Sequence, residues 1–320
     1  MTFPLRQLQQ KDFPPLLKEI FDPPASLYIR GTLPTFDSRP AQQQTSKQRP
    51  VAEPATSEAF VQTSLKDPSE ITYLCVVGSR ASTLYGRRMT QKLIAGLRGY
   101  PVAIVSGMAI GIDSEAHKAA LEVGIPTVAV LPSGLRDDII YPAQNRALAK
   151  QILKSGGALI SENEPDFKAM LHSFAQRNRI AAGMSKATLI VEAGEKSGTL
   201  ITARLALNYN REVLCVPHEL GKESGAGVNT LIREGATLVR DSNDILQALG
   251  FKVEEKLEQQ ALPTDLNESE IKIMNALTEA LTRDDLIEAA SLSAQDANIG
   301  LSSLLIRGLI VERLGKIERL

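Results

Sequence analysis

Six short apolar runs recur through the middle of the chain, and a cluster of Gly, Ser, Arg or Glu follows each of them. The runs lie at 71–77, 102–105, 127–131, 158–160, 188–191 and 213–216. Short β-branched runs that alternate with helical patterns are typical of parallel strands buried on both faces of a sheet. Such strands deliver their last residues to one edge, where open α/β sheets bind ligands. The sequence therefore predicts an α/β fold, an extended Rossmann-like parallel sheet with helices on both faces, and a ligand site at its carboxyl edge.

Composition divides the 320 residues into five parts. Residues 1–37 carry a short helical pattern and an extended segment, which predicts a leading element packed on the sheet. Residues 38–70 are rich in Gln, Pro and Ser and lack hydrophobic periodicity, which predicts a flexible insertion. The sheet and its helices should occupy 71–250, followed by a linker at 251–265 and a second domain at 266–320. The core helices are expected at 87–97, 113–123, 144–153, 174–184 and 200–208. The segment from Gly225 to Asn229 is expected to be a tight turn leading into a further helix near Leu231.

The second domain is marked by three helix caps. Asn267 and Glu270 have the spacing of a capping box, and Thr282 and Ser293 are the expected caps of two further helices. Residues 309–320 then read as a hairpin around a glycine. Three helices followed by a hairpin predict a small winged-helix domain.

Charge is distributed unevenly between the two domains. Residues 71–250 hold 20 Lys and Arg against 16 Asp and Glu, whereas 265–320 hold 6 against 10. A polyanion is therefore expected on the first domain and not on the winged helix. Cys75 and Cys215 each fall inside a predicted strand and should be buried free thiols, with no spacing typical of a metal site. No secretory segment and no apolar run of ~18 residues occurs, which predicts a cytoplasmic protein.

Three glycine-containing segments at strand-to-helix connections suit an anionic ligand. They are Gly78-Ser79-Arg80, the run from Gly107 to Gly111, and Lys196-Ser197-Gly198-Thr199. Glycine allows close approach of the backbone, and free N–H groups at a helix start attract phosphate. Tight turns and helix caps need the same residue types, so a purely structural role is the alternative for each segment. The fingerprints of classical dinucleotide and Walker-type phosphate sites are missing.

One predicted helix opens with an aromatic residue, an amide and two arginines, at Phe174, Arg177, Asn178 and Arg179. Arginines at a helix start oppose the helix dipole, which suggests an external negative charge that they meet. Phe174 could offer its face to a nucleobase. The alternative is that an arginine pairs with a glutamate such as Glu162 and that Phe174 belongs to the core.

The remaining polar residues do not form a catalytic constellation. His117, His172 and His218 are isolated from one another, and no nucleophile elbow or suitable carboxylate pair occurs. We therefore expect a binding protein that is not an enzyme and needs neither a cofactor nor a metal.

Several of these segments together resemble the DNA-processing protein A (DprA, also called Smf) family. They include SGMAIGIDSEAH at 106–117, RNRIAAGMS at 177–185 and VEAGEKSGTLITA at 191–203, and the resemblance covers about 13–250. It implies a homodimeric Rossmann-like core that binds single-stranded DNA without sequence preference. It also implies that the protein helps to load the RecA recombinase onto that strand during natural transformation.

The resemblance carries DNA contact to thirteen candidate positions in this sequence: Gly78, Ser79, Arg80, Gly107, Gly111, Phe174, Arg177, Asn178, Arg179, Lys196, Ser197, Gly198 and Thr199. The sequence departs from the family in three ways. We expect it to lack the sterile-alpha-motif-like domain with which many members begin, it has the insertion at 38–70, and it has His218 where Pro-Gly is usual.

Two other functions are compatible with the same fold class. A Rossmann-like nucleotide-binding protein or phosphoribohydrolase-type enzyme should show G-G-x-G-T-x-x-E, yet Gly198-Thr199 is followed by Leu-Ile-Thr-Ala with no glutamate. A regulator of double-stranded DNA would read it through the winged helix. The expected recognition helix at 294–307 has Asp296 near its start and an arginine only at its end, which suits phosphates poorly.

Overall fold

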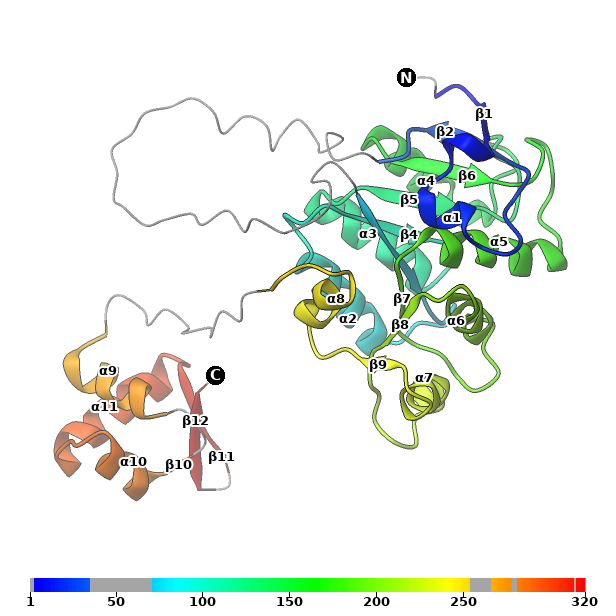
Figure 1. The fold of residues 1–320 in the computed structure, drawn as a ribbon. Coiled ribbons are helices and arrows are strands. Elements are labelled where there is room, and N and C mark those ends of the chain that lie inside the picture. Colours follow the sequence, from blue (N-terminus) through cyan, green and yellow to red (C-terminus); the bar gives the residue numbers. More distant parts are fainter. Residues whose placement is uncertain (1–2, 35–70, 254–265, 278–280, 314, 320) are drawn as a thin grey trace, which may run out of the picture. The chain divides into compact units, whose positions relative to one another are not determined.

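The computed structural model describes residues 3–34, 71–253, 266–277, 281–313 and 315–319 of the chain. These belong to two compact units, Met1–Val253 and Glu254–Leu320 (Figure 1). The insertion predicted at 38–70 and most of the predicted linker lie outside the described residues. Among the helices that are described, none is long and apolar enough to cross a membrane.

The first unit is built on a nine-stranded sheet in the order β1-β2-β6-β5-β4-β3-β7-β8-β9. All six apolar runs form strands in it, and these strands are mutually parallel where they pair. Their bounds are β3 (Thr72–Val77), β4 (Val102–Ser106), β5 (Thr127–Val130), β6 (Ala158–Ser161), β7 (Ala187–Ile190) and β8 (Glu212–Cys215). The predicted fold class is therefore confirmed.

The sheet is not wholly parallel, however, because the N-terminal segment adds two antiparallel strands to one side. β2 (Ser26–Gly31) pairs with β6, with Ile29 opposite Ile160, and β1 (Arg6–Gln9) pairs with β2. This segment was expected to pack on the sheet, and only α1 (Pro15–Lys18) does so, against α5. β2 instead pairs with the backbone N–H and C=O groups of β6, which would otherwise be an open edge strand of the sheet. At the other edge, the short β9 (Thr237–Leu238) pairs parallel with β8.

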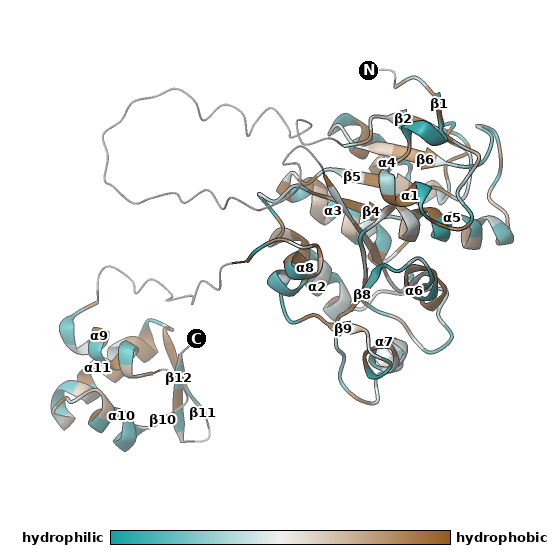
Figure 2. Cartoon of the chain, in the orientation of Figure 1, coloured by the Kyte–Doolittle hydropathy of each residue, from teal (hydrophilic) through white to brown (hydrophobic). Residues whose placement is uncertain are grey.

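Helices cover both faces of this sheet. One layer contains α2 (Leu84–Ala95), α3 (Ile112–Val123), α4 (Arg146–Lys154) and α8 (Ser242–Ala248), and the other contains α1, α5 (Leu171–Met184), α6 (Thr199–Asn208) and α7 (Glu223–Arg233). Alternate residues of β3 serve the two layers: Cys75 and Val77 pack in one core, and Leu74 and Val76 in the other. Strands β4 and β5 are accordingly hydrophobic along their length (Figure 2). Cys75 and Cys215 are buried free thiols, as expected.

The helix α7 begins earlier than its glycine-containing sequence predicts. Its segment from Gly225 to Asn229 was expected to be a turn leading into a helix near Leu231, but it lies wholly inside α7. A Cβ at Gly225 would strike the His218 ring, and one at Gly227 would come within 2.6 Å of the Gly194 carbonyl oxygen. The glycines therefore allow close packing of the helix and do not mark a turn.

The second unit has the elements expected of a winged helix. They are α9 (Glu268–Ala276), β10 (Leu281–Thr282), α10 (Arg283–Ala289), α11 (Ala294–Ile306), β11 (Ile310–Arg313) and β12 (Lys316–Arg319), the three strands forming one small sheet. The Asn267 side chain accepts a hydrogen bond from the Glu270 backbone N–H at 2.9 Å, so the predicted capping box is present. The helix in the recognition position, α11, exposes Ile299 and Ile306.

The first unit includes the first three residues of the predicted linker, 251–253. Phe251 is only 3% exposed, and its ring centroid lies 5.5 Å from that of Tyr100. Phe251 and the partly buried Val253 therefore belong to the core that α2 and α8 share.

We expect Phe251→Ala to lower the free energy of unfolding of the first unit by about 3–5 kcal/mol, since it leaves a cavity in a packed core. Lys252→Ala is the matched control, because Lys252 is exposed and such substitutions stay within about 0.5 kcal/mol. Urea unfolding of the full chain measures both. An unfolding free energy for Phe251→Ala that equals that of Lys252→Ala would place residue 251 in the linker.

Candidate functional site

An open groove of about 710 Å³ lies where β3 ends and where α5 and α6 begin. It is at the carboxyl edge of the sheet, where the sequence placed the ligand site. Nine of the thirteen candidate residues line it: Gly78, Ser79, Arg80, Phe174, Arg177, Asn178, Ser197, Gly198 and Thr199. A small hollow beside it shares Arg80, Phe174 and Arg177 and is also lined by Gly107. The structure thus brings most of the predicted site together, while Gly111, Arg179 and Lys196 are not among the lining residues.

Gly111 does not line the groove but lies against the loop that does. It precedes α3 with a positive φ of 90°, and a Cβ there would strike the carbonyl oxygen of Ser79. That oxygen accepts a hydrogen bond from the Ile112 N–H at 3.1 Å. Glycine at this position therefore lets the start of α3 support the Gly78-Ser79-Arg80 loop, and its role is structural.

Arg177 is buried, with 6% of its surface exposed. α5 begins at Leu171, so Arg177 lies in the second turn and not at the helix start, as the sequence argument assumed. Its Nη1 donates to the carbonyl oxygens of Gly107 and Val130, the second at 2.6 Å. These two oxygens belong to the segments that leave β4 and β5. Arg177 is therefore mainly a tie between two strand ends, with its surface forming part of the groove floor.

Asp113 lies buried beside this guanidinium. Burial raises the pKa of its carboxyl, and the positive charge of Arg177 acts in the opposite direction. Burial likewise lowers the pKa of Arg177, while Asp113 raises it. The Asp113 Oδ2 accepts a hydrogen bond from the Ala109 N–H at 3.3 Å. The acid and the base therefore stabilise each other beneath the glycine loop, where neither could be charged alone at low cost.

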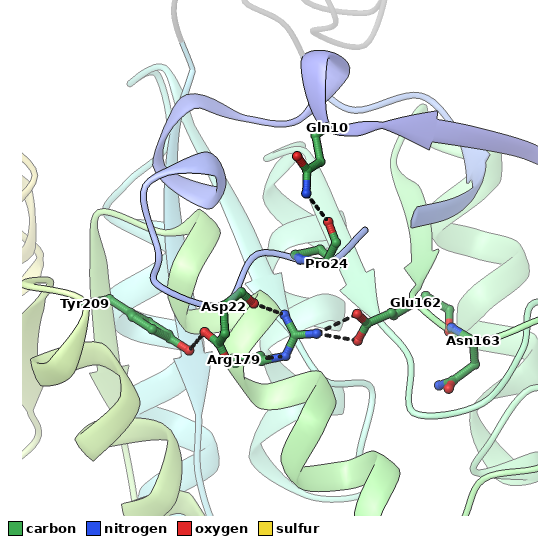
Figure 3. A network of polar contacts seen from close by, with 8 residues as sticks. Gln10, Asp22, Pro24, Glu162, Asn163, Arg179 and Tyr209 are labelled. Carbon is green, nitrogen blue, oxygen red and sulfur yellow. Dashed lines mark hydrogen bonds and ion pairs between the residues drawn. The ribbon is translucent and has the colours of Figure 1, made fainter. Parts of the chain in front are cut away.

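Arg179 is not among the residues that line the groove, and it contacts Asp22 of the N-terminal segment and Glu162 instead (Figure 3). Its Nη2 donates to both carboxylate oxygens of Glu162, at 2.5 and 2.6 Å, and its Nη1 donates to the Asp22 carbonyl oxygen at 2.7 Å. The Tyr209 hydroxyl donates to the Asp22 carboxylate at 2.7 Å. The pairing with Glu162 that the sequence left open as the alternative is thus the one observed. We remove Arg179 from the candidate phosphate contacts.

Arg80 differs from the other two arginines because its side chain is exposed. Its Cζ lies 5.1 Å from the centroid of the Phe174 ring, a cation–π distance. The Tyr141 ring meets Phe174 edge to face, with the centroids 5.4 Å apart. An exposed cation therefore lies over one ring of an aromatic pair, and ligand phosphates can reach the cation from solvent.

The groove also has an apolar rim that the site prediction missed. Leu171 is 91% exposed, and Ile110, Tyr141 and Ile201 are also exposed around the groove and the hollow beside it. Exposed apolar side chains that cluster at a cavity indicate a binding surface. Tyr141 could have been suspected, since it belongs to a Tyr-Pro pair just after the loop that follows β5. Leu171 and Ile201 gave no signal, because each resembles an ordinary helix residue.

Two of the histidines, His117 and His218, have their hydrogen-bond partners outside the groove lining. His117 is fully buried, its Nδ1–H donates to Thr127 Oγ1 at 2.7 Å, and burial lowers its pKa to about 3. His218 packs against Tyr85 and hydrogen-bonds the Val216 carbonyl oxygen. None of the described residues that line the groove is a histidine. The site is suited to holding an anion with an aromatic part.

Comparisons with known proteins agree with this geometry. The family described as DNA recombination-mediator protein A matches residues 54–250. Protein Smf of Synechocystis is 33% identical over 337 residues, covering 95% of this chain and 77% of that protein. The solved structure of DNA processing protein A from Helicobacter pylori superposes with a TM-score of 0.59 at 26% identity, over 78% of this chain and 98% of that one. That structure is described as giving insight into a single-stranded DNA binding mode.

Protein Smf of Escherichia coli is 44% identical over 178 residues. These cover 56% of this chain and 47% of the E. coli protein, so the chain spans about half the length of that relative.

We predict that Arg177→Ala lowers the free energy of unfolding by at least about 2 kcal/mol at pH 7, since it leaves two buried carbonyls and Asp113 without their partner. The loss should shrink toward pH 4. Removing the cation raises the folded pKa of Asp113 further above its unfolded value of about 3.9, and a group with a raised folded pKa stabilises the fold most when it is protonated. Chemical unfolding at both pH values measures this effect.

The control for that experiment is Asp113→Asn combined with Arg177→Ala. On the Asp113→Asn background, the stability loss caused by Arg177→Ala should be the same at pH 4 and pH 7, because position 113 no longer carries a carboxyl that can be protonated. An equal loss for Arg177→Ala at pH 4 and pH 7 would show that Asp113 does not depend on Arg177.

Proposed function

The chain belongs to the DNA recombination-mediator protein A family, and from this premise we propose that it binds single-stranded DNA in the groove at the carboxyl edge of its sheet. The observation that carries the proposal is Arg80 over the face of Phe174, at 5.1 Å. Single-stranded nucleic acid is bound by cations that meet the backbone and by aromatic rings that stack on bases. The groove offers both, together with an apolar rim.

The proposal includes binding without sequence preference. Every base has a π-face, so stacking on Phe174 and Tyr141 would accept any of them. The described residues that line the groove include Asn178 as their single amide side chain, too few hydrogen-bonding groups of this kind to read base edges one by one.

We extend the proposal to the partners of the protein. It would act as a homodimer in the cytoplasm and help to load the RecA recombinase onto the bound strand during DNA uptake and natural transformation. Its support is the family to which the chain belongs. Under this proposal the protein is a mediator and turns over no substrate.

A nucleotide-binding protein or phosphoribohydrolase-type enzyme is the second candidate. The groove volume of about 710 Å³ favours it to some extent, since small-molecule sites measure roughly 300–1,000 Å³. Against it stands the segment after Gly198-Thr199, which has no glutamate where such enzymes should have one. A competition experiment decides between the two candidate functions. Only a nucleotide-binding site predicts that a mononucleotide displaces a bound thymidine oligonucleotide when both are present at the same concentration.

We expect Arg80→Ala to reduce the slope of log affinity against log salt by about 0.7, because one phosphate contact and its released counterion are lost. Fluorescence anisotropy with labelled single strands at several salt concentrations measures the slope. Arg233→Ala is the matched control, since Arg233 is exposed at the C-terminal end of α7 and the carboxyl edge of the sheet lies at helix starts. An unchanged slope for Arg80→Ala would exclude Arg80 from the phosphate path.

Phe174→Ala should weaken single-strand binding about fivefold or more, since stacking on one base is worth roughly 1–3 kcal/mol. Phe174→Trp should retain the affinity, because it keeps an aromatic face. Equilibrium titration gives the affinities, and thermal melting reports on the fold. Normal affinity with a lowered melting temperature in Phe174→Ala would assign Phe174 to the core and not to the DNA.

A further inference from the structure

We propose that the outer surface of α2 is a second contact region for the same DNA strand, which follows this helix after it leaves the groove. This inference rests on the proposed function and adds a binding region to it. It would be formed by Tyr85, Arg88 and Lys92, named here the α2 stripe. None of these three residues lines the groove.

The first observation is a long stretch without acidic residues. Residues 71–112 contain five Lys and Arg and no Asp or Glu, and α2 itself carries three of those cations. Some exposed cations elsewhere on the surface have acidic partners, as where Lys118 pairs with Glu115 on α3 at 2.8 Å. Arg88 and Lys92 are exposed, and in the described part of the chain they form no ion pair. Their full charge is therefore available to a polyanion.

The second observation is continuity with the groove. Ala81 lines the groove, and Thr83, two residues later, caps α2 by accepting the Gly86 N–H at 3.1 Å. The buried Glu192 carboxylate accepts the Thr83 N–H at 3.0 Å and so holds this junction in place. Arg80 and Tyr85 have four residues between them, and the five steps from one Cα atom to the next place these two Cα atoms at most about 19 Å apart. One strand can therefore meet both without a change in the fold.

The third observation is that Tyr85 is an exposed ring held rigidly. It is 43% exposed, its hydroxyl donates to the Pro217 carbonyl oxygen at 2.9 Å, and the His218 ring meets it edge to face with the centroids 5.1 Å apart. Its polar end is thus satisfied, and its remaining surface is open to a base. Arg88 and Lys92 follow at spacings of three and seven residues, which places them on the same side of the helix. A base on Tyr85 and phosphates on the two cations would use the whole stripe.

A second copy of the chain fits this surface less well. A symmetric contact would place the α2 stripe of one protomer against or near that of its partner, and four unpaired cations would then repel one another. Lysine is also depleted in protein interfaces. The charge therefore favours a polyanion.

The test is the full chain with Arg88→Ala combined with Lys92→Ala, compared with Lys150→Ala combined with Lys154→Ala. The control removes the same charge from two exposed lysines of α4. Each protein is titrated with thymidine oligonucleotides of about 5 and about 20 nucleotides, the first near the lower end of the usual site sizes of about 4–16 nucleotides and the second beyond their upper end. For the long strand, loss of both contacts should reduce the salt slope by about 1.4, or about 0.7 for each cation. The short strand and the control should be unaffected, and Tyr85→Ala should weaken only the long strand.

Three results would overturn the inference. A salt slope for the long strand equal to that of the control would show that the cations do not meet DNA. An equal loss for both lengths would show that the substitutions act on the groove. Failure of the unsubstituted protein to bind either strand would refute the proposed function itself, whereas normal groove binding with no effect of the α2 variants would refute only the extension.

Discussion

A buried guanidinium holds the carboxyl edge of the sheet together, and the groove depends on it. Arg177 donates to the carbonyl oxygen of Gly107, directly after β4, and to that of Val130, the last residue of β5, so one side chain fixes the ends of two strands. A charged group in such a position is costly unless all its donors find acceptors. The residue at position 107 must be glycine for this arrangement, because a Cβ there would collide with the Arg177 guanidinium. Glycine at position 107 is therefore needed to make room for the Arg177 side chain, whether or not its backbone also approaches a ligand.

Three arginines that looked equivalent in the sequence have three different roles on this scaffold. Arg177 is buried and ties strand ends, Arg179 is neutralised by Glu162 and holds the N-terminal segment, and Arg80 is exposed over an aromatic ring. The difference comes from burial and from the carboxylates within reach, which residue type alone does not reveal. A ligand anion therefore meets one free cation from this set, backed by a second that is already satisfied. Affinity for a long polyanion would need further cations, and the acid-free surface of α2 supplies them.

The pattern of short apolar runs was sufficient to predict the parallel strands and the edge at which the site lies, because it depends on local periodicity and on a general property of α/β sheets. The same reasoning could not find β1, since three of its four residues are polar and exposed. It mistook the start of α7 for a turn, because the glycines there serve close packing with distant residues. It also misassigned Arg179, whose acceptor at Asp22 lies 157 residues away in the sequence. Contacts between distant segments decide these features, and a single sequence does not show them.

Photo-crosslinking tests the central claim most directly. A single-stranded oligonucleotide that contains 5-iodouracil would be bound to the full chain, irradiated, and the crosslinked peptides identified by mass spectrometry. If the groove holds the strand, crosslinks should map to the peptides that contain Phe174 and Tyr141, the aromatic rings that meet there. Crosslinks confined to residues 266–320 would contradict the account, because they would place the DNA on the acidic second unit.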